Sequence, residues 1–146
     1  MLCGNMAINV CPQSASYANR CGLRRYTAVL ATAGLRHWPW FQPIGVDIEE
    51  IFSAQTATEL TDNIITPAEH ERLADCGLAF SLALTLAFSA KESAFKASEI
   101  QTDAGFLDYQ IISWNKQQVI IHRENEMFAV HWQIKEKIVI TLCQHD

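Results

Sequence analysis

Apolar and polar residues alternate between positions 44 and 49, where isoleucine or valine occupies every second position. A period of two is typical of a β-strand. Because successive side chains of a strand point to opposite faces, we expect Ile44, Val46 and Ile48 to face a core. Asp47 and Glu49 then project from the opposite face, two residues apart and close enough to share one cation.

Helix signals follow this strand. A short helix is predicted near residues 56–60. A second helix is predicted to begin at Thr66, which can cap it, with Pro67 at the first helical position and Glu69 completing a capping box. Gly77 marks its expected end.

A longer helix is predicted from about residue 80 to residue 98, with leucine, alanine and phenylalanine on most of its faces. Its polar residues gather at the C-terminal end. Glu92 and Lys96 lie four residues apart, on one face of this helix, with Ser89 near that face.

The chain after Gly105 carries short runs rich in β-branched and aromatic residues, at 109–114, 118–122, 128–133 and 138–143. Such runs, separated by polar turns, are typical of an antiparallel meander. A strand, then helices, then strands predict an α+β domain with an antiparallel sheet packed against a long helix.

Composition narrows the class of protein. The 146 residues carry a formal net charge of -5, which does not favour a nucleic-acid partner. The five cysteines form no CxxC pair, so reduced thiols in a cytoplasmic protein are expected. The most apolar run, residues 77–90, is shorter than the roughly 20 residues of a transmembrane segment.

Residues 1–42 differ from the rest of the chain, since no acidic residue occurs before Asp47. We expect an atypical N-terminal segment at 1–42 and a domain at 43–146. The segment could be a basic targeting arm. The abrupt change of composition near Pro43 suggests the other hypothesis, that this first segment comes from a truncated or out-of-frame reading of its gene.

Three carboxylates and two lysines form the candidate site. Asp47, Glu49 and Glu92 could hold Mg²⁺, which prefers carboxylates together with ligand phosphates and water. Lys91 and Lys96 could supply positive charge to a phosphorylated ligand.

Each of these residues also has a simpler interpretation. Spacing alone favours Asp47 and Glu49 as the solvent face of an edge strand. Glu92 and Lys96 could form a surface ion pair worth about 0.3–0.5 kcal/mol. Glu69, taken alone, is best explained by its place in the capping box. Reaction and substrate do not follow from spacing.

Two segments carry a family resemblance: Ile44-Gly45-Val46-Asp47-Ile48-Glu49 and Phe88-Ser89-Ala90-Lys91-Glu92-Ser93-Ala94-Phe95-Lys96. Together they resemble the signature of the 4'-phosphopantetheinyl transferases, over roughly residues 43–144. The string at 82–93 resembles the siderophore-pathway members of the longer class, whose fold has two halves related by a pseudo-twofold axis. The resemblance implies that this domain corresponds to one such half.

The resemblance implies transfer of the phosphopantetheine arm of coenzyme A to a serine of an apo carrier protein, in enterobactin-like siderophore biosynthesis. The carrier could be an aryl, peptidyl or acyl carrier protein. Asp47, Glu49 and Glu92 would hold Mg²⁺, and Lys96 would contact a phosphate of coenzyme A, beside Lys91. Glu69 would help to deprotonate the serine. Glu69, Glu92 and Lys96 are thus the implied catalytic residues.

The sequence departs from the longer class before Asp47, where it has too few residues for the first half and no matching Ser-His element. Three alternatives follow. The chain could be an active transferase that assembles as a homo-oligomer, as the half-length members do. It could instead be an incomplete, non-catalytic fragment, or an unrelated Mg²⁺-binding α+β module.

Overall fold

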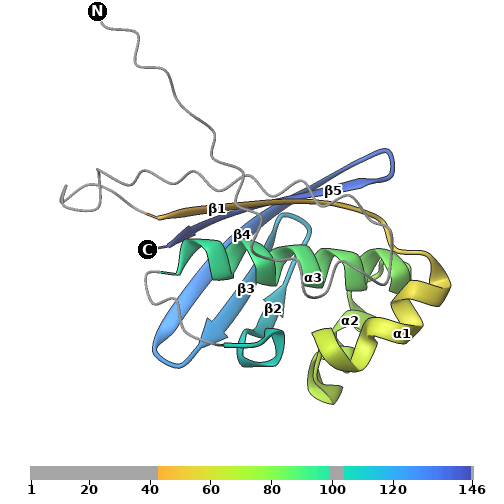
Figure 1. Ribbon diagram of the computed structural model, residues 1–146, viewed down its shortest axis with the longest axis horizontal. Coiled ribbons are helices and arrows are strands. Elements are labelled where there is room, and N and C mark those ends of the chain that lie inside the picture. Colours follow the sequence, from red (N-terminus) through yellow and green to blue (C-terminus); the bar gives the residue numbers. More distant parts are fainter. Residues whose placement is uncertain (1–42, 99–103, 146) are drawn as a thin grey trace, which may run out of the picture.

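The computed structural model describes residues 43–98 and 104–145. Along the chain the elements are β1 (Ile44–Glu50), α1 (Ala54–Ile64), α2 (Pro67–Asp75), α3 (Phe80–Ala97), η2 (Phe106–Asp108), β2 (Gln110–Trp114), β3 (Gln118–Arg123), β4 (Glu126–Lys135) and β5 (Ile138–His145). The strands form one antiparallel sheet, and α3 lies across one of its faces with α1 and α2 beside it (Figure 1). The predicted α+β fold is confirmed.

The sheet order is β1-β5-β4-β3-β2, so the first described strand pairs with the last one. This pairing is antiparallel and places Asp47 opposite Thr141. Strands β2 to β5 follow one another as the predicted meander. The predicted segment 1–42 lies outside the described residues.

The prediction of which face of β1 meets the core was wrong. Asp47 and Glu49 are only 2% and 4% exposed, whereas Ile44 is 38% exposed. The reason is Gly45, which shares a face with the two carboxylates. A Cβ atom there would lie 1.8 Å from the carbonyl oxygen of Ser93 on α3. Helix α3 therefore covers the acidic face of the strand.

Small and hydroxyl-bearing residues allow α3 to approach the sheet this closely. Ser93 and Ser89 each contact the hydroxyl of Thr141 on β5, with oxygen separations of 2.6 and 2.9 Å. The Thr141 hydroxyl donates to the Ser89 carbonyl at 2.9 Å. Because all three side chains are buried, these bonds offset the cost of removing their hydroxyl groups from water.

The predicted helix signals are confirmed, although α1 is longer than the short helix expected. Ser53 caps α1 by accepting a hydrogen bond from the Thr56 backbone nitrogen at 3.1 Å. Thr66 and Glu69 form the expected capping box at the start of α2. Gly77 follows the end of α2 with a φ of 77°, a backbone conformation that glycine adopts without strain.

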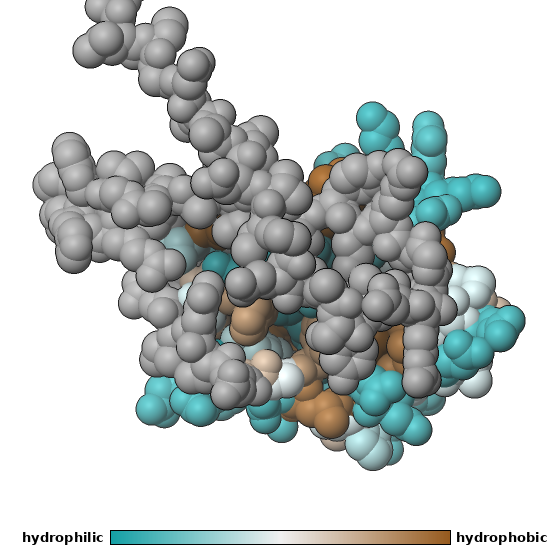
Figure 2. Space-filling model, in the orientation of Figure 1, coloured by the Kyte–Doolittle hydropathy of each residue, from teal (hydrophilic) through white to brown (hydrophobic). Residues whose placement is uncertain are grey.

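The turn between β4 and β5 forms the hydrophilic tip of the longest hairpin, where polar side chains project from the domain (Figure 2). Lys135, Glu136 and Lys137 are all exposed there. The Ile51 nitrogen donates to the Lys137 carbonyl at 2.9 Å, which joins this tip to the end of β1.

Helix α3 is largely buried within the domain. Within residues 43–98 and 104–145, no helix combines the length and apolar character that crossing a membrane requires.

Candidate functional site

Asp47 lies on the buried face of β1 and is paired with Lys96 from α3. The Lys96 ammonium is 2.7 Å from Asp47 Oδ1 and donates to the Val46 carbonyl at 3.0 Å. The second oxygen, Oδ2, is buried and has no hydrogen-bond partner among the described residues. A buried carboxylate oxygen left in this state is costly unless a bound group completes it.

Glu49 lies along the same junction between β1 and α3, and Glu92 lies on α3. The two elements run in opposite directions, since Gly45 approaches Ser93 while the Phe52 nitrogen donates to Thr85 Oγ1 at 2.9 Å. Glu49 therefore lies between these two points of contact, beside the middle of α3. Glu92 precedes Lys96 by one helical turn.

The donor set at this junction fits Mg²⁺ in part. No three His, Cys, Asp or Glu side chains converge as metal ligands anywhere in residues 43–98 and 104–145. Mg²⁺ does not require such a cage, because it is usually held by one or two carboxylates together with phosphate oxygens and water. The uncompensated Oδ2 of Asp47 is a suitable oxygen for such a cation.

A pocket of about 550 Å³ opens next to Glu92. It is walled by the end of α1, by α3 and by the segment that leads through η2 into β2. Its lining residues are Asp62, Asn63, Lys91, Glu92, Phe95, Ala104, Gly105, Phe106, Leu107, Asp108 and Tyr109. Glu92 thus belongs both to this pocket and to the helix that carries Lys96.

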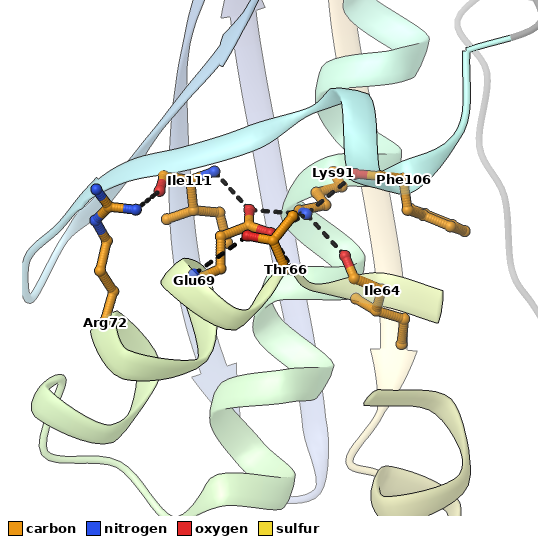
Figure 3. Close-up of polar contacts among 7 residues, drawn as sticks. All are labelled: Ile64, Thr66, Glu69, Arg72, Lys91, Phe106 and Ile111. Atoms are coloured by element: carbon orange, nitrogen blue, oxygen red, sulfur yellow. Dashed lines mark hydrogen bonds and ion pairs between the residues drawn. The ribbon is translucent and has the colours of Figure 1, made fainter. Parts of the chain in front are cut away.

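Lys91 is directed away from that junction, into the layer between the helices (Figure 3). Its ammonium donates to the Ile64 carbonyl at 2.7 Å and to the Phe106 carbonyl at 3.0 Å. It also forms an ion pair with Glu69 at 2.8 Å. Burial lowers the pKa of the Lys91 amine below its usual value, and the charge and hydrogen bond of Glu69 oppose that shift.

Glu69 is equally enclosed. Its carboxylate accepts hydrogen bonds from the Thr66 nitrogen at 2.8 Å and the Ile111 nitrogen at 2.7 Å, besides its pair with Lys91. Arg72, one turn later on α2, donates to the Ile111 carbonyl at 3.1 Å. Four of the predicted site residues therefore form two pairs, Asp47 with Lys96 at the strand and Glu69 with Lys91 beside the pocket. Glu49 lies on β1, and Glu92 lines the pocket.

Sequence reasoning missed a buried polar cluster behind the pocket. Arg123 donates to the Tyr109 hydroxyl at 2.8 Å and to the Ser98 hydroxyl at 3.3 Å, and its guanidinium lies 5.0 Å from the centre of the Tyr109 ring. One signal was available: Arg123 occupies the same alternate positions of β3 as the buried Val119 and Ile121. An arginine at an inward-facing position of a strand indicates that its charge has a buried partner.

Tyr109 is expected to ionise only above the usual tyrosine pKa of about 10. Burial raises the pKa of its hydroxyl, and the Arg123 charge opposes this. The folded state thus favours the neutral form of Tyr109 more than the unfolded state does. The stability that this preference contributes is complete below about pH 10 and is lost as the pH rises through the pKa of Tyr109 in the folded protein. To measure this pKa, the absorbance of tyrosinate is followed during alkaline titration of the parent and of Tyr109→Phe. The difference between the two curves reports the ionisation of Tyr109. If this difference curve gives a pKa at or below the usual tyrosine value, the burial of the Tyr109 hydroxyl is contradicted.

The sequence model of the 4'-phosphopantetheinyl transferase superfamily matches residues 43–143. Over 105 residues the chain is 97% identical to enterobactin synthase component D of Escherichia coli (strain K12), covering 72% of this chain and 51% of that protein. Component D of Salmonella typhi is 50% identical over 82 residues, which cover 56% of this chain and 35% of that relative. The chain thus spans about half, or less, of the length of these curated relatives.

Solved structures agree in fold. A holo-(acyl-carrier-protein) synthase from Bacillus anthracis str. Ames, in complex with CoA (3',5'-ADP), gives a TM-score of 0.52 at 21% identity, over 71% of this chain and 95% of that chain. The holo-[acyl-carrier-protein] synthase of Neisseria meningitidis gives 0.55 at 17% identity, over 72% and 98%. Together with the match over residues 43–143, these findings confirm the resemblance: the chain belongs to the 4'-phosphopantetheinyl transferase superfamily.

Proposed function

We propose that the chain transfers the 4'-phosphopantetheine arm of coenzyme A to a serine of an apo carrier protein. The observation that carries this proposal is the ion pair between Asp47 on β1 and Lys96 on α3, in which Asp47 Oδ2 has no hydrogen-bond partner among the described residues. Glu92, which lines the pocket, lies on the same helix as Lys96. A buried lysine beside a carboxylate suits a phosphate anion with its bound cation. The identity to enterobactin synthase component D supports a carrier in enterobactin synthesis.

In this mechanism Lys96 binds a phosphate oxygen of coenzyme A, and Asp47, Glu49 and Glu92 are the residues that would hold Mg²⁺. When bound, that ion offsets the negative charge on the pyrophosphate. The serine oxygen bonds to the phosphorus that bears the pantetheine arm, and the bond from this phosphorus to the bridging oxygen breaks. Adenosine 3',5'-bisphosphate leaves, and the serine proton passes to a carboxylate.

Glu92 is the carboxylate that we assign to this proton. Its side chain is partly buried in the pocket wall, where a serine hydroxyl that enters the pocket can reach it. A base must lie within hydrogen-bond reach of the proton that it takes, directly or through one water. We place the reaction in the cytoplasm, where thiols such as those of Cys76 and Cys143 stay reduced.

Intact-mass spectrometry tests this function. An apo carrier protein is incubated with the chain, coenzyme A and Mg²⁺, and a mass gain of one phosphopantetheine arm is expected. Glu92→Ala should lose the gain, while Glu71→Ala, an exposed position of α2, should keep it. No gain from a folded parent would favour the non-catalytic fragment.

We further propose that copies of the chain associate through the face of β1 and β5 that lies opposite α3. Alternate residues of both strands there are aliphatic, and Ile44, Ile138 and Leu142 are 38%, 42% and 40% exposed. Val46, opposite Leu142 in the pairing, extends the same apolar surface. Exposed aliphatic surface of this kind is typical of a protein interface.

Leu142→Glu is expected to dissociate such an oligomer, because it would bury a charge between the apolar faces. Light scattering after size exclusion measures the mass of parent and variant. Thr58→Glu, on the exposed side of α1, is the matched control and should leave the mass unchanged. A monomeric parent would overturn the proposed association.

A further inference from the structure

Both oxygens of the Glu69 carboxylate are engaged by donors from within the domain. Oε1 accepts from the Ile111 nitrogen at 2.7 Å and lies 2.8 Å from the Lys91 ammonium. Oε2 accepts from the Thr66 nitrogen at 2.8 Å and from Lys91 at 3.0 Å. The two backbone N–H groups and one N–H of Lys91, shared between the two oxygens, thus occupy most of the roughly four lone-pair sites of the carboxylate. The side chain is 1% exposed.

Lys91 is saturated in the same way. An ammonium has three N–H donors, and this one meets Glu69, the Ile64 carbonyl and the Phe106 carbonyl. Its side chain is 0% exposed. Lys91 is among the residues that line the pocket, but reaching a phosphate of a ligand there would require its ammonium to abandon one of these buried partners.

The pair instead joins the segments that build the pocket (Figure 3). Ile64 is the last residue of α1, and Phe106 begins η2. Both segments line the pocket, and Lys91 itself precedes Glu92 on α3. Through Thr66 and Ile111 the same pair also holds the start of α2 and the strand β2. One ion pair thus connects five elements around a single cavity.

We propose that Glu69 and Lys91 are positioning residues, which hold the pocket walls and Glu92 in place, and that Glu69 takes no proton from the carrier serine. This inference rests on the proposed transfer reaction. A proton on Glu69 would displace one of its three donors, the Thr66 and Ile111 N–H groups and Lys91, and leave that donor unpaired and buried. Two neighbouring charges that neutralise each other and satisfy every donor are suited to fixing geometry.

Paired substitutions separate this role from that of a base. Glu69→Gln and Lys91→Met each leave one buried charge without its partner, whereas the combined variant removes both charges together. Replacing a complete buried ion pair by neutral residues of similar volume is often tolerated, while breaking one is not. Glu71→Gln, two positions along α2 and exposed, is the matched control.

Three readouts are taken: amide hydrogen exchange of residues 104–111, the affinity for coenzyme A with Mg²⁺, and kcat and KM for transfer. Each single variant is expected to speed exchange at least tenfold, to weaken coenzyme A binding and to raise KM. The combined variant is expected to return all three readouts to within about threefold of the parent. The control should match the parent in each.

The inference is overturned if Glu69→Gln lowers kcat alone, with exchange and coenzyme A binding unchanged, and if the combined variant folds but stays inactive. That pattern would identify Glu69 as the base. If the parent itself transfers nothing, the proposed function fails for this chain. Amide exchange in residues 104–111 then still tests whether Glu69 and Lys91 position the pocket. If Glu69→Gln and Lys91→Met leave that exchange rate unchanged, the positioning role is refuted.

Discussion

Replacing Gly45 by alanine is expected to cost more than about 3 kcal/mol of folding free energy, beyond the usual range for an overpacked core. The added Cβ would lie 1.8 Å from the Ser93 carbonyl oxygen and 2.9 Å from the Ala97 nitrogen. Both atoms belong to the backbone of α3, so no side chain can rotate away. Relief requires the helix to move off the sheet, which would also separate Ser93 from Thr141.

Chemical denaturation followed by circular dichroism measures this loss. A total stability of about 5–15 kcal/mol is usual for a domain, so the variant should be largely unfolded at moderate denaturant concentrations. Gly105→Ala is the control, because the nearest atom to its added Cβ, Asp108 Oδ2, lies 4.0 Å away. Equal unfolding midpoints for Gly45→Ala and the parent would contradict the close packing of α3 on β1.

Asp47→Asn is expected to reduce kcat/KM for transfer by about a hundredfold or more, the scale seen when one preorganised electrostatic group is removed. The change keeps the shape of the side chain but removes the charge that faces Lys96 and that would attract a cation at Oδ2. The Mg²⁺ concentration needed for half-maximal rate should rise as well. Steady-state transfer measured across a Mg²⁺ series checks both effects.

Glu50→Gln is the matched control for this variant, since Glu50 lies on the same strand but is exposed. It should leave both the rate and the Mg²⁺ dependence unchanged. A folded Asp47→Asn variant with parental rates would remove the strand carboxylates from the proposed mechanism. Circular dichroism of both variants excludes unfolding as the cause of a lost rate.

The sequence predicted elements better than their orientation. The period of two at residues 44–49 predicted β1, and the capping signals at Thr66 predicted α2, because both patterns are local. The face of β1 depends on what packs against it. Hydropathy favoured the isoleucine face, whereas Gly45 and the small residues of α3 made the acidic face the closer fit. A glycine within an alternating strand indicates such an approach.

The candidate site was predicted in composition but not in arrangement. Glu69 was expected to complete a capping box, and it does so. Its contacts with Lys91 and Ile111 span 22 and 42 positions of sequence, and no local pattern predicts them. Arg123 and Tyr109 were missed for the same reason. Long-range polar contacts become visible only when the sheet brings distant segments together.

The two bonds that α2 makes with Ile111 also bear on how the protein behaves at high concentration. Strand β2 lies at one edge of the sheet, and edge strands can recruit strands from other molecules. At Ile111 the backbone N–H is occupied by Glu69 and the carbonyl by Arg72, and the register shifts just beyond it. An incoming strand would therefore have to displace Glu69 and Arg72 to pair with β2 at that position, so these two bonds oppose edge-to-edge association there.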